Sequence, residues 1–160
     1  MQTMRALWVT ASIAILFVSP VLAEEPVGCD KFKWPVEKEM TVLRASHLQE
    51  IKSGTKLSGV PFVATLVLIP SDTANLPAAP ERAPKDNTFS GYLSMPDIAA
   101  GTHSIGLSDA AWVDVVQDGR FLKSKAHSGV QGCRGIRKVF QFELGADPIT
   151  IQVSDDPHRG

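Results

Sequence analysis

The chain has 160 residues, of which 44% are hydrophobic and 21% charged, and its 16 basic residues nearly balance its 17 acidic ones. The two signs of charge are interspersed, which argues against a nucleic-acid partner and against binding to a strongly anionic membrane surface. The length suits one domain with its own hydrophobic core.

Residues 1–23 have the order of a secretory signal peptide. Arg5 precedes an apolar run from Ala6 to Val18, and Ser19-Pro20 lead to the small-residue cleavage site Val21-Leu22-Ala23. The alternative is an uncleaved anchor, but the run is short for the ~20 residues of a membrane span. We expect cleavage after Ala23 and a periplasmic or secreted mature chain, with no membrane attachment.

The chain has two cysteines, Cys29 and Cys133. Two thiols in an oxidising compartment usually pair, and a bridge here would close a loop of roughly 100 residues and stabilise the fold by about 4–5 kcal/mol. The alternative is two free thiols, one of them reactive. Neither cysteine has a second cysteine or a histidine at metal-ligand spacing, so we predict a disulfide and no zinc site.

Residues 24–59 are expected to pack as an N-terminal segment on the rest of the domain. Val36, Met40 and Leu43 recur at helical spacing behind Pro35, which favours a short helix near 35–45. An alternating strand over 34–42 is the other interpretation.

The next two segments differ in composition. Residues 60–69 are apolar and rich in β-branched side chains, which predicts a strand buried on both faces. Residues 71–87 contain Pro77, Pro80 and Pro84 among small and charged residues, and we expect a long, mobile surface loop.

From residue 89 onwards, apolar and polar residues alternate. Period-two patterns over 89–95, 103–108, 140–144 and 149–154 predict short antiparallel strands. We therefore predict a mainly β fold, a jelly-roll-like antiparallel sandwich of about seven or eight strands over residues 60–154, with a flexible tail at 155–160.

One hairpin can be placed in register. Asp118-Gly119 between two apolar runs is a strong two-residue turn signal. It pairs Gln117 with Arg120 and, further along, Asp114 with Lys123 and Trp112 with Lys125. The opposite face of the hairpin is more apolar and is assigned to the core, so Trp112 lies on a polar face.

Trp112 is the best candidate for a binding residue. An exposed indole beside Asp114, Lys123 and Lys125 suits the stacking and hydrogen bonding of a sugar ring. Tyr92 lies on a polar face too and adds a second aromatic if its strand neighbours the hairpin. The alternatives are that the N-terminal segment covers Trp112, or that the register is shifted by one residue.

No motif in the chain indicates catalysis. The four histidines, His47, His103, His127 and His158, are not in a ligand motif, and there is no Gly-x-Ser-x-Gly elbow. Ligands from separate strands can still converge in a β fold. We predict no catalytic residue, no metal ligand and no cofactor.

Several runs carry a family resemblance. They are the sequences AGTHSIGLSD (100–109), AWVDVVQDGR (111–120) and GCRGIRK (132–138), with CDKFKW (29–34) at the front. The chain resembles a group of small secreted alphaproteobacterial proteins, some of them labelled homogentisate 1,2-dioxygenase. That label implies a larger cupin enzyme whose iron is held by histidines and a carboxylate. The first two runs taken together are also similar to β-sandwich domains appended to secreted peptidases and to carbohydrate-binding modules, which implies a sandwich fold.

Together these observations favour a non-enzymatic binding or accessory module of the cell envelope, with a glycan or a partner protein as ligand. A metal-dependent oxygenase and a structural envelope protein without a ligand are the alternatives.

Overall fold

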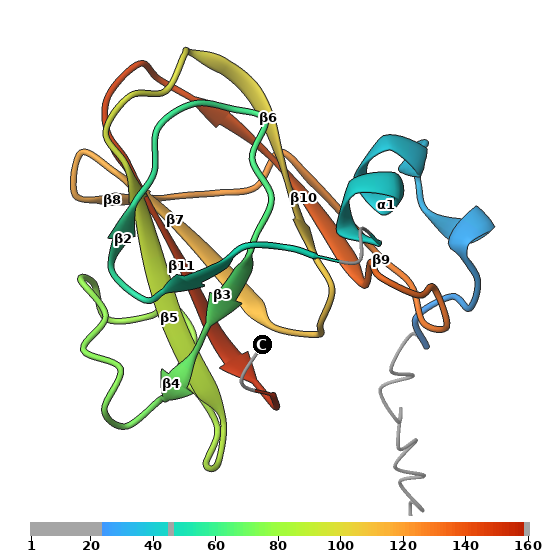
Figure 1. Ribbon diagram of the computed structural model, residues 1–160, viewed down its shortest axis with the longest axis horizontal. Helices are drawn as coiled ribbons and strands as arrows, with labels where there is room; N and C mark the ends of the chain where they lie inside the picture. Colours follow the sequence, from blue (N-terminus) through green and yellow to red (C-terminus); the bar gives the residue numbers. More distant parts are fainter. Residues whose placement is uncertain (1–23, 45–46, 159–160) are drawn as a thin grey trace, which may run out of the picture.

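The computed structural model describes residues 24–44 and 47–158 (Figure 1), so the expected signal peptide lies outside the described residues. Within them the chain is mainly β, as predicted, and none of its helices is long and apolar enough to cross a membrane. The elements are the 3-10 helix η1 (Cys29–Lys31), α1 (Glu37–Leu43), β1 (Glu50–Lys52), β2 (Thr55–Lys56), β3 (Thr65–Val67), β4 (Ile69–Pro70), β5 (Phe89–Met95), β6 (Gly101–Leu107), β7 (Trp112–Gln117), β8 (Arg120–Leu122), β9 (Ala126–Gly129), β10 (Lys138–Leu144) and β11 (Ile149–Asp156).

The long strands form two sheets. The larger has the order β2-β5-β11-β7-β8 with β4 also on β5, and the smaller has the order β6-β10-β9. The predicted sandwich-like β fold is confirmed, but the described residues form eleven strands instead of seven or eight. The additional ones are mostly short strands between residues 50 and 70, and β1–β3 and β2–β5 pair in parallel, unlike the antiparallel pattern expected.

The main core lies between the two sheets. Alternate residues of β7 and β11 point into it, among them Val113, Val115 and Ile151, and Phe142 of β10 meets them from the smaller sheet. Burial of these side chains removes apolar area from water, which is the main stabilising term of the fold.

A second apolar cluster lies on the other side of the smaller sheet. Val139 of β10 points away from the main core and packs with Val36, Val130 and Ile136, and Met40 of α1 packs against them. In Figure 1 residues 24–44, which include η1 and α1, lie beside β9 and β10. The predicted helix and the predicted Cys29–Cys133 disulfide are both confirmed, and the bridge ties the N-terminal segment to the loop before β10.

The predicted hairpin forms at its turn and ends early. Asp118 and Gly119 have φ values of 51° and 70°, as the turn requires. Residues 115–117 of β7 pair with 122–120 of β8 in the predicted register, but β8 ends at Leu122. The three pairs predicted beyond it, Asp114 with Lys123, Val113 with Ser124 and Trp112 with Lys125, do not form.

The 60–69 segment differs from its prediction. It is not one strand buried on both faces, because only β3 and β4 at its end are strands and neither of them contains a fully buried residue. Leu68 is buried, while Val67 and Ile69 point outwards. At the other end of the domain, β11 continues to Asp156 and so includes the first two residues of the expected tail, Asp155 and Asp156, which are both buried.

Candidate functional site

Three of the predicted binding residues share the outer face of the larger sheet: Trp112, Asp114 and Tyr92. Gln152 of β11 pairs with Tyr92 of β5 on one side and with Asp114 of β7 on the other. Residues paired across neighbouring strands share a face, so Tyr92, Gln152 and Asp114 form one row. A whole strand therefore separates Tyr92 from the hairpin that carries Trp112.

A long segment covers this face, which we call the strap (residues 71–88). The Ser71 N–H donates to the Thr88 carbonyl (2.9 Å), which closes the base of the strap. The Ala78 N–H donates to Gln152 Oε1 (2.9 Å) and the Lys85 N–H donates to Asp155 Oδ1 (3.0 Å). The strap is therefore held at several points along its length, which differs from the mobile loop that its composition predicts.

Trp112 is half-buried, and one approach to its ring lies against Arg82 of the strap. Its Nε1–H donates to Asp114 Oδ1 (2.7 Å), and the Arg82 guanidinium lies 5.8 Å from the ring centroid. Both the polar edge of the indole and one approach to its face are thus occupied by the protein itself.

Asp114 is a buried structural acceptor, only 2% exposed. One carboxylate oxygen accepts the indole N–H and the other accepts the Glu81 backbone N–H (3.1 Å). Both oxygens already bind donors, so the side chain ties Trp112 to the strap.

The two predicted lysines do not join this group. Lys123 follows the end of β8 and is exposed. The Lys125 N–H donates to the Gln141 carbonyl (2.7 Å) and its Nζ lies 3.3 Å from Glu143 Oε2, so Lys125 belongs to the smaller sheet. Of the five residues predicted for the site, the structure brings Trp112 and Asp114 into contact.

Sequence reasoning missed the residues that anchor the strap. Gln152 is 1% exposed and Ser90 is fully buried, although the alternating pattern places both on the polar face. Ser90 Oγ is 2.7 Å from Ser71 Oγ at the base of the strap. The long Pro-containing segment opposite a polar strand face was the available signal, because its backbone groups need partners when it packs.

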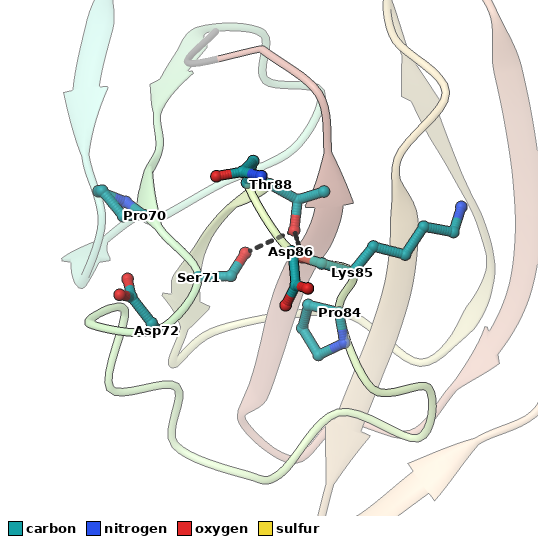
Figure 2. Close-up of a pocket in the computed structure, with 8 residues that line it drawn as sticks. Pro70, Ser71, Asp72, Pro84, Lys85, Asp86 and Thr88 are labelled. Carbon is teal, nitrogen blue, oxygen red and sulfur yellow. Dashed lines mark hydrogen bonds between the residues drawn. The ribbon is translucent and has the colours of Figure 1, made fainter.

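A hollow of about 610 Å³ lies where the two ends of the strap meet (Figure 2). It is lined by residues 70–72 and 84–88, and Figure 2 shows the Asp72 and Asp86 carboxylates in it. Lys85 Nζ lies 3.3 Å from Asp155 Oδ2. The hollow therefore presents two exposed acids and no further arrangement that points to a reaction.

Four large apolar side chains are exposed on the 60–69 segment, and we call them the apolar strip. They are Val60 (49% exposed), Phe62 (40%), Val67 (36%) and Ile69 (38%). Lys52 of β1 pairs with Val67 of β3, so a positive charge adjoins the strip. Exposed patches of large apolar side chains are typical of surfaces that bind other molecules.

The histidines lie in different parts of the fold. His103 has Nε2 2.8 Å from the Ala99 carbonyl, and His127 stacks on Phe140 with centroids 6.2 Å apart. Within residues 24–44 and 47–158, no three histidine, cysteine, aspartate or glutamate side chains are grouped so that they could hold a metal ion.

Comparison with known proteins gives no relative to set beside this geometry: no family model matches the chain, and neither a curated protein nor a solved structure does.

Proposed function

We propose that the chain is a secreted, non-enzymatic binding module of the bacterial envelope, and that its ligand is a partner protein. The observation that carries the proposal is the apolar strip. Two of its side chains, Val67 and Ile69, flank Leu68, which is buried in the main core, so this end of the strip stands on a rigid base.

The chemistry of the strip indicates the kind of partner. Apolar side chains gain free energy when a complementary apolar surface covers them. The Lys52 ammonium beside Val67 favours a partner with an acidic group at the rim of that surface. A protein segment with apolar side chains and a flanking carboxylate fits both features.

The geometry gives less support to the alternative hypothesis that the ligand is a glycan. Its expected platform was Trp112 with Asp114, and these two side chains bind each other and the strap. A sugar would have to displace Arg82 to reach that ring face.

The signal-like sequence of residues 1–23 supports a periplasmic or secreted location. The Cys29–Cys133 disulfide agrees with it, since disulfides persist in oxidising compartments.

A photo-crosslinking amino acid placed at Phe62 tests the proposal in living cells. We expect it to capture one envelope protein, whereas the same amino acid at exposed Lys123 captures none. In the same cells, Ile69→Ser should abolish the Phe62 crosslink without changing the amount of the protein.

Two results would contradict the proposal. One is an absence of any crosslink that is specific to Phe62. The other is co-sedimentation of the purified protein with peptidoglycan that is lost in Trp112→Phe and retained in Ile69→Ser, which would assign a glycan ligand to the face beneath the strap.

A further inference from the structure

Three sulfur atoms lie close together at the second apolar cluster. The Cys29–Cys133 disulfide joins η1 to the loop before β10. Met40 of α1 adds a thioether whose Sδ lies 3.5 Å from Cys133 Sγ. Three separate parts of the chain therefore deliver sulfur to one place.

A fixed positive charge lies against these sulfurs. Arg44 Nη2 is 3.6 Å from Cys29 Sγ and 3.7 Å from Met40 Sδ. Its Nε–H donates to the Arg134 carbonyl (2.7 Å), which holds the guanidinium in place. Gly135 permits this approach, because a Cβ there would lie 2.8 Å from Arg44 Cγ.

The surroundings are apolar on one side and open on the other. Cys133 is buried among Val36, Val130 and Ile136. A hollow of about 310 Å³ adjoins Cys29 and is lined by Trp34 among others, so a small reagent has a route to the less buried sulfur.

Reduction would change the chemistry of this site. A dithiol gives two electrons and two protons to the disulfide, so the S–S bond breaks, two thiols form and the reagent becomes a disulfide. Two thiolates and a thioether are then a soft donor set of the kind that selects Cu(I). Binding displaces the two thiol protons to solvent.

We propose that Cys29, Cys133 and Met40, once the disulfide is reduced, bind one Cu(I) ion with Arg44 as counter-charge. Two thiolates around Cu(I) carry a net charge of −1, which the guanidinium neutralises. The spacing of cysteines and histidines does not reveal this set, because it is α1 that brings Met40 to the cysteines.

The test uses the mature protein, reduced with a dithiol and desalted without oxygen. Cu(I) is titrated in competition with a chromophoric Cu(I) chelator, and circular dichroism records the β signal throughout. We expect one equivalent of Cu(I) bound by the reduced protein and none by the oxidised protein.

Matched variants separate the site from two free thiols. Met40→Leu should weaken binding at least about tenfold and Arg44→Gln by about tenfold, since counter-charges and outer partners tune metal affinity on that scale. Met95→Leu is the control, because Met95 is buried in the main core far from the disulfide in the fold, and its binding should match the wild type.

Three outcomes would overturn the proposal. They are the absence of competition by the reduced protein, equal affinity of Met40→Leu and wild type, and loss of the β signal on reduction. The last would mean that the fold no longer brings Met40 to the cysteines.

Discussion

Gln152 and Ala78 are joined by two reciprocal hydrogen bonds although 74 residues separate them. The Ala78 N–H donates to Gln152 Oε1 (2.9 Å) and Gln152 Nε2 donates to the Ala78 carbonyl (3.1 Å). The side-chain amide thus acts as a backbone partner in the middle of the larger sheet. Ala78 lies in a part of the strap that is not a strand, and Gln152 supplies the hydrogen-bond partners that its backbone N–H and carbonyl need.

Gln152→Leu should therefore destabilise the protein. The substitution leaves the half-buried N–H and carbonyl of Ala78 without partners, and we expect the free energy of unfolding to fall by about 1–3 kcal/mol. Urea unfolding measures this loss, and hydrogen exchange should show faster exchange at the Ala78 amide. Gln131→Leu is the matched control at an exposed position. Equal stability of the two variants would show that the strap does not depend on this clamp.

The alternation of 149–154 predicted a strand correctly, but it did not reveal what covers the strand. Period-two patterns report which residues share a face, and a polar face is usually in water. Here Gln152 and Ser154 are buried beneath the strap. The covering segment has no periodicity of its own, so its local sequence does not show which face it packs on.

The hairpin shows the same limit at longer range. The Asp118-Gly119 signal is local, and it predicted the turn and the three nearest pairs. Beyond Leu122 the chain leaves β7 because Lys125 bonds to β10, a contact between residues 16 positions apart that a turn signal does not contain. The disulfide was predictable because two cysteines allow a single pairing.

Trp112→Phe should lower stability as well as remove an aromatic surface. The phenyl ring cannot donate to Asp114, whose carboxylate is buried, and a lost hydrogen bond to a charged group costs about 1.5–3 kcal/mol. Thermal and urea unfolding measure the loss. Lys123→Ala, at an exposed position near the same hairpin, should change stability by less than about 0.5 kcal/mol. An unchanged unfolding midpoint in Trp112→Phe would show that the hydrogen bond to Asp114 adds no stability, and the indole of the wild type would then be available to a ligand.

Replacing both cysteines by serine should destabilise the protein, and the second apolar cluster more than the main core. The bridge spans 104 positions, and closing a loop of that length stabilises a fold by about 4–5 kcal/mol in the chain-entropy model. We expect a loss of this size in urea unfolding, with hydrogen exchange of Val139 rising more than that of Val115 in the main core. A loss below about 1 kcal/mol would show that the second apolar cluster holds without the bridge.

Asp155 should stabilise the fold at neutral pH. Burial by itself raises the pKa of this carboxyl, but the Lys85 backbone N–H and ammonium outweigh it and hold the pKa below its ordinary value of 3.8. The native state then binds fewer protons than the unfolded state, so this stabilisation is present above pH 3.8 and is lost as pH falls through the lowered pKa. Asn tolerates the positive φ of 57° at this position. Asp155→Asn should cost about 0.5 kcal/mol at pH 7, since the Lys85 ammonium is exposed, and almost nothing in strong acid.

Asp156 should show the opposite pH dependence although it is the next residue. Burial raises the pKa of its carboxyl above 3.8, the Asp109 charge adds to this, and the His158 backbone N–H offsets part of it. The native state binds the extra proton, so stability falls as pH rises from 3.8 through the raised pKa. Asp156→Asn removes the buried charge and keeps an acceptor for His158, and we expect a gain of roughly 1 kcal/mol at pH 7 that disappears below the ordinary pKa. Urea unfolding of both variants across the acid range compares the two signs directly. A loss of stability in Asp156→Asn at neutral pH would mean that its charge, like that of Asp155, has a stabilising partner.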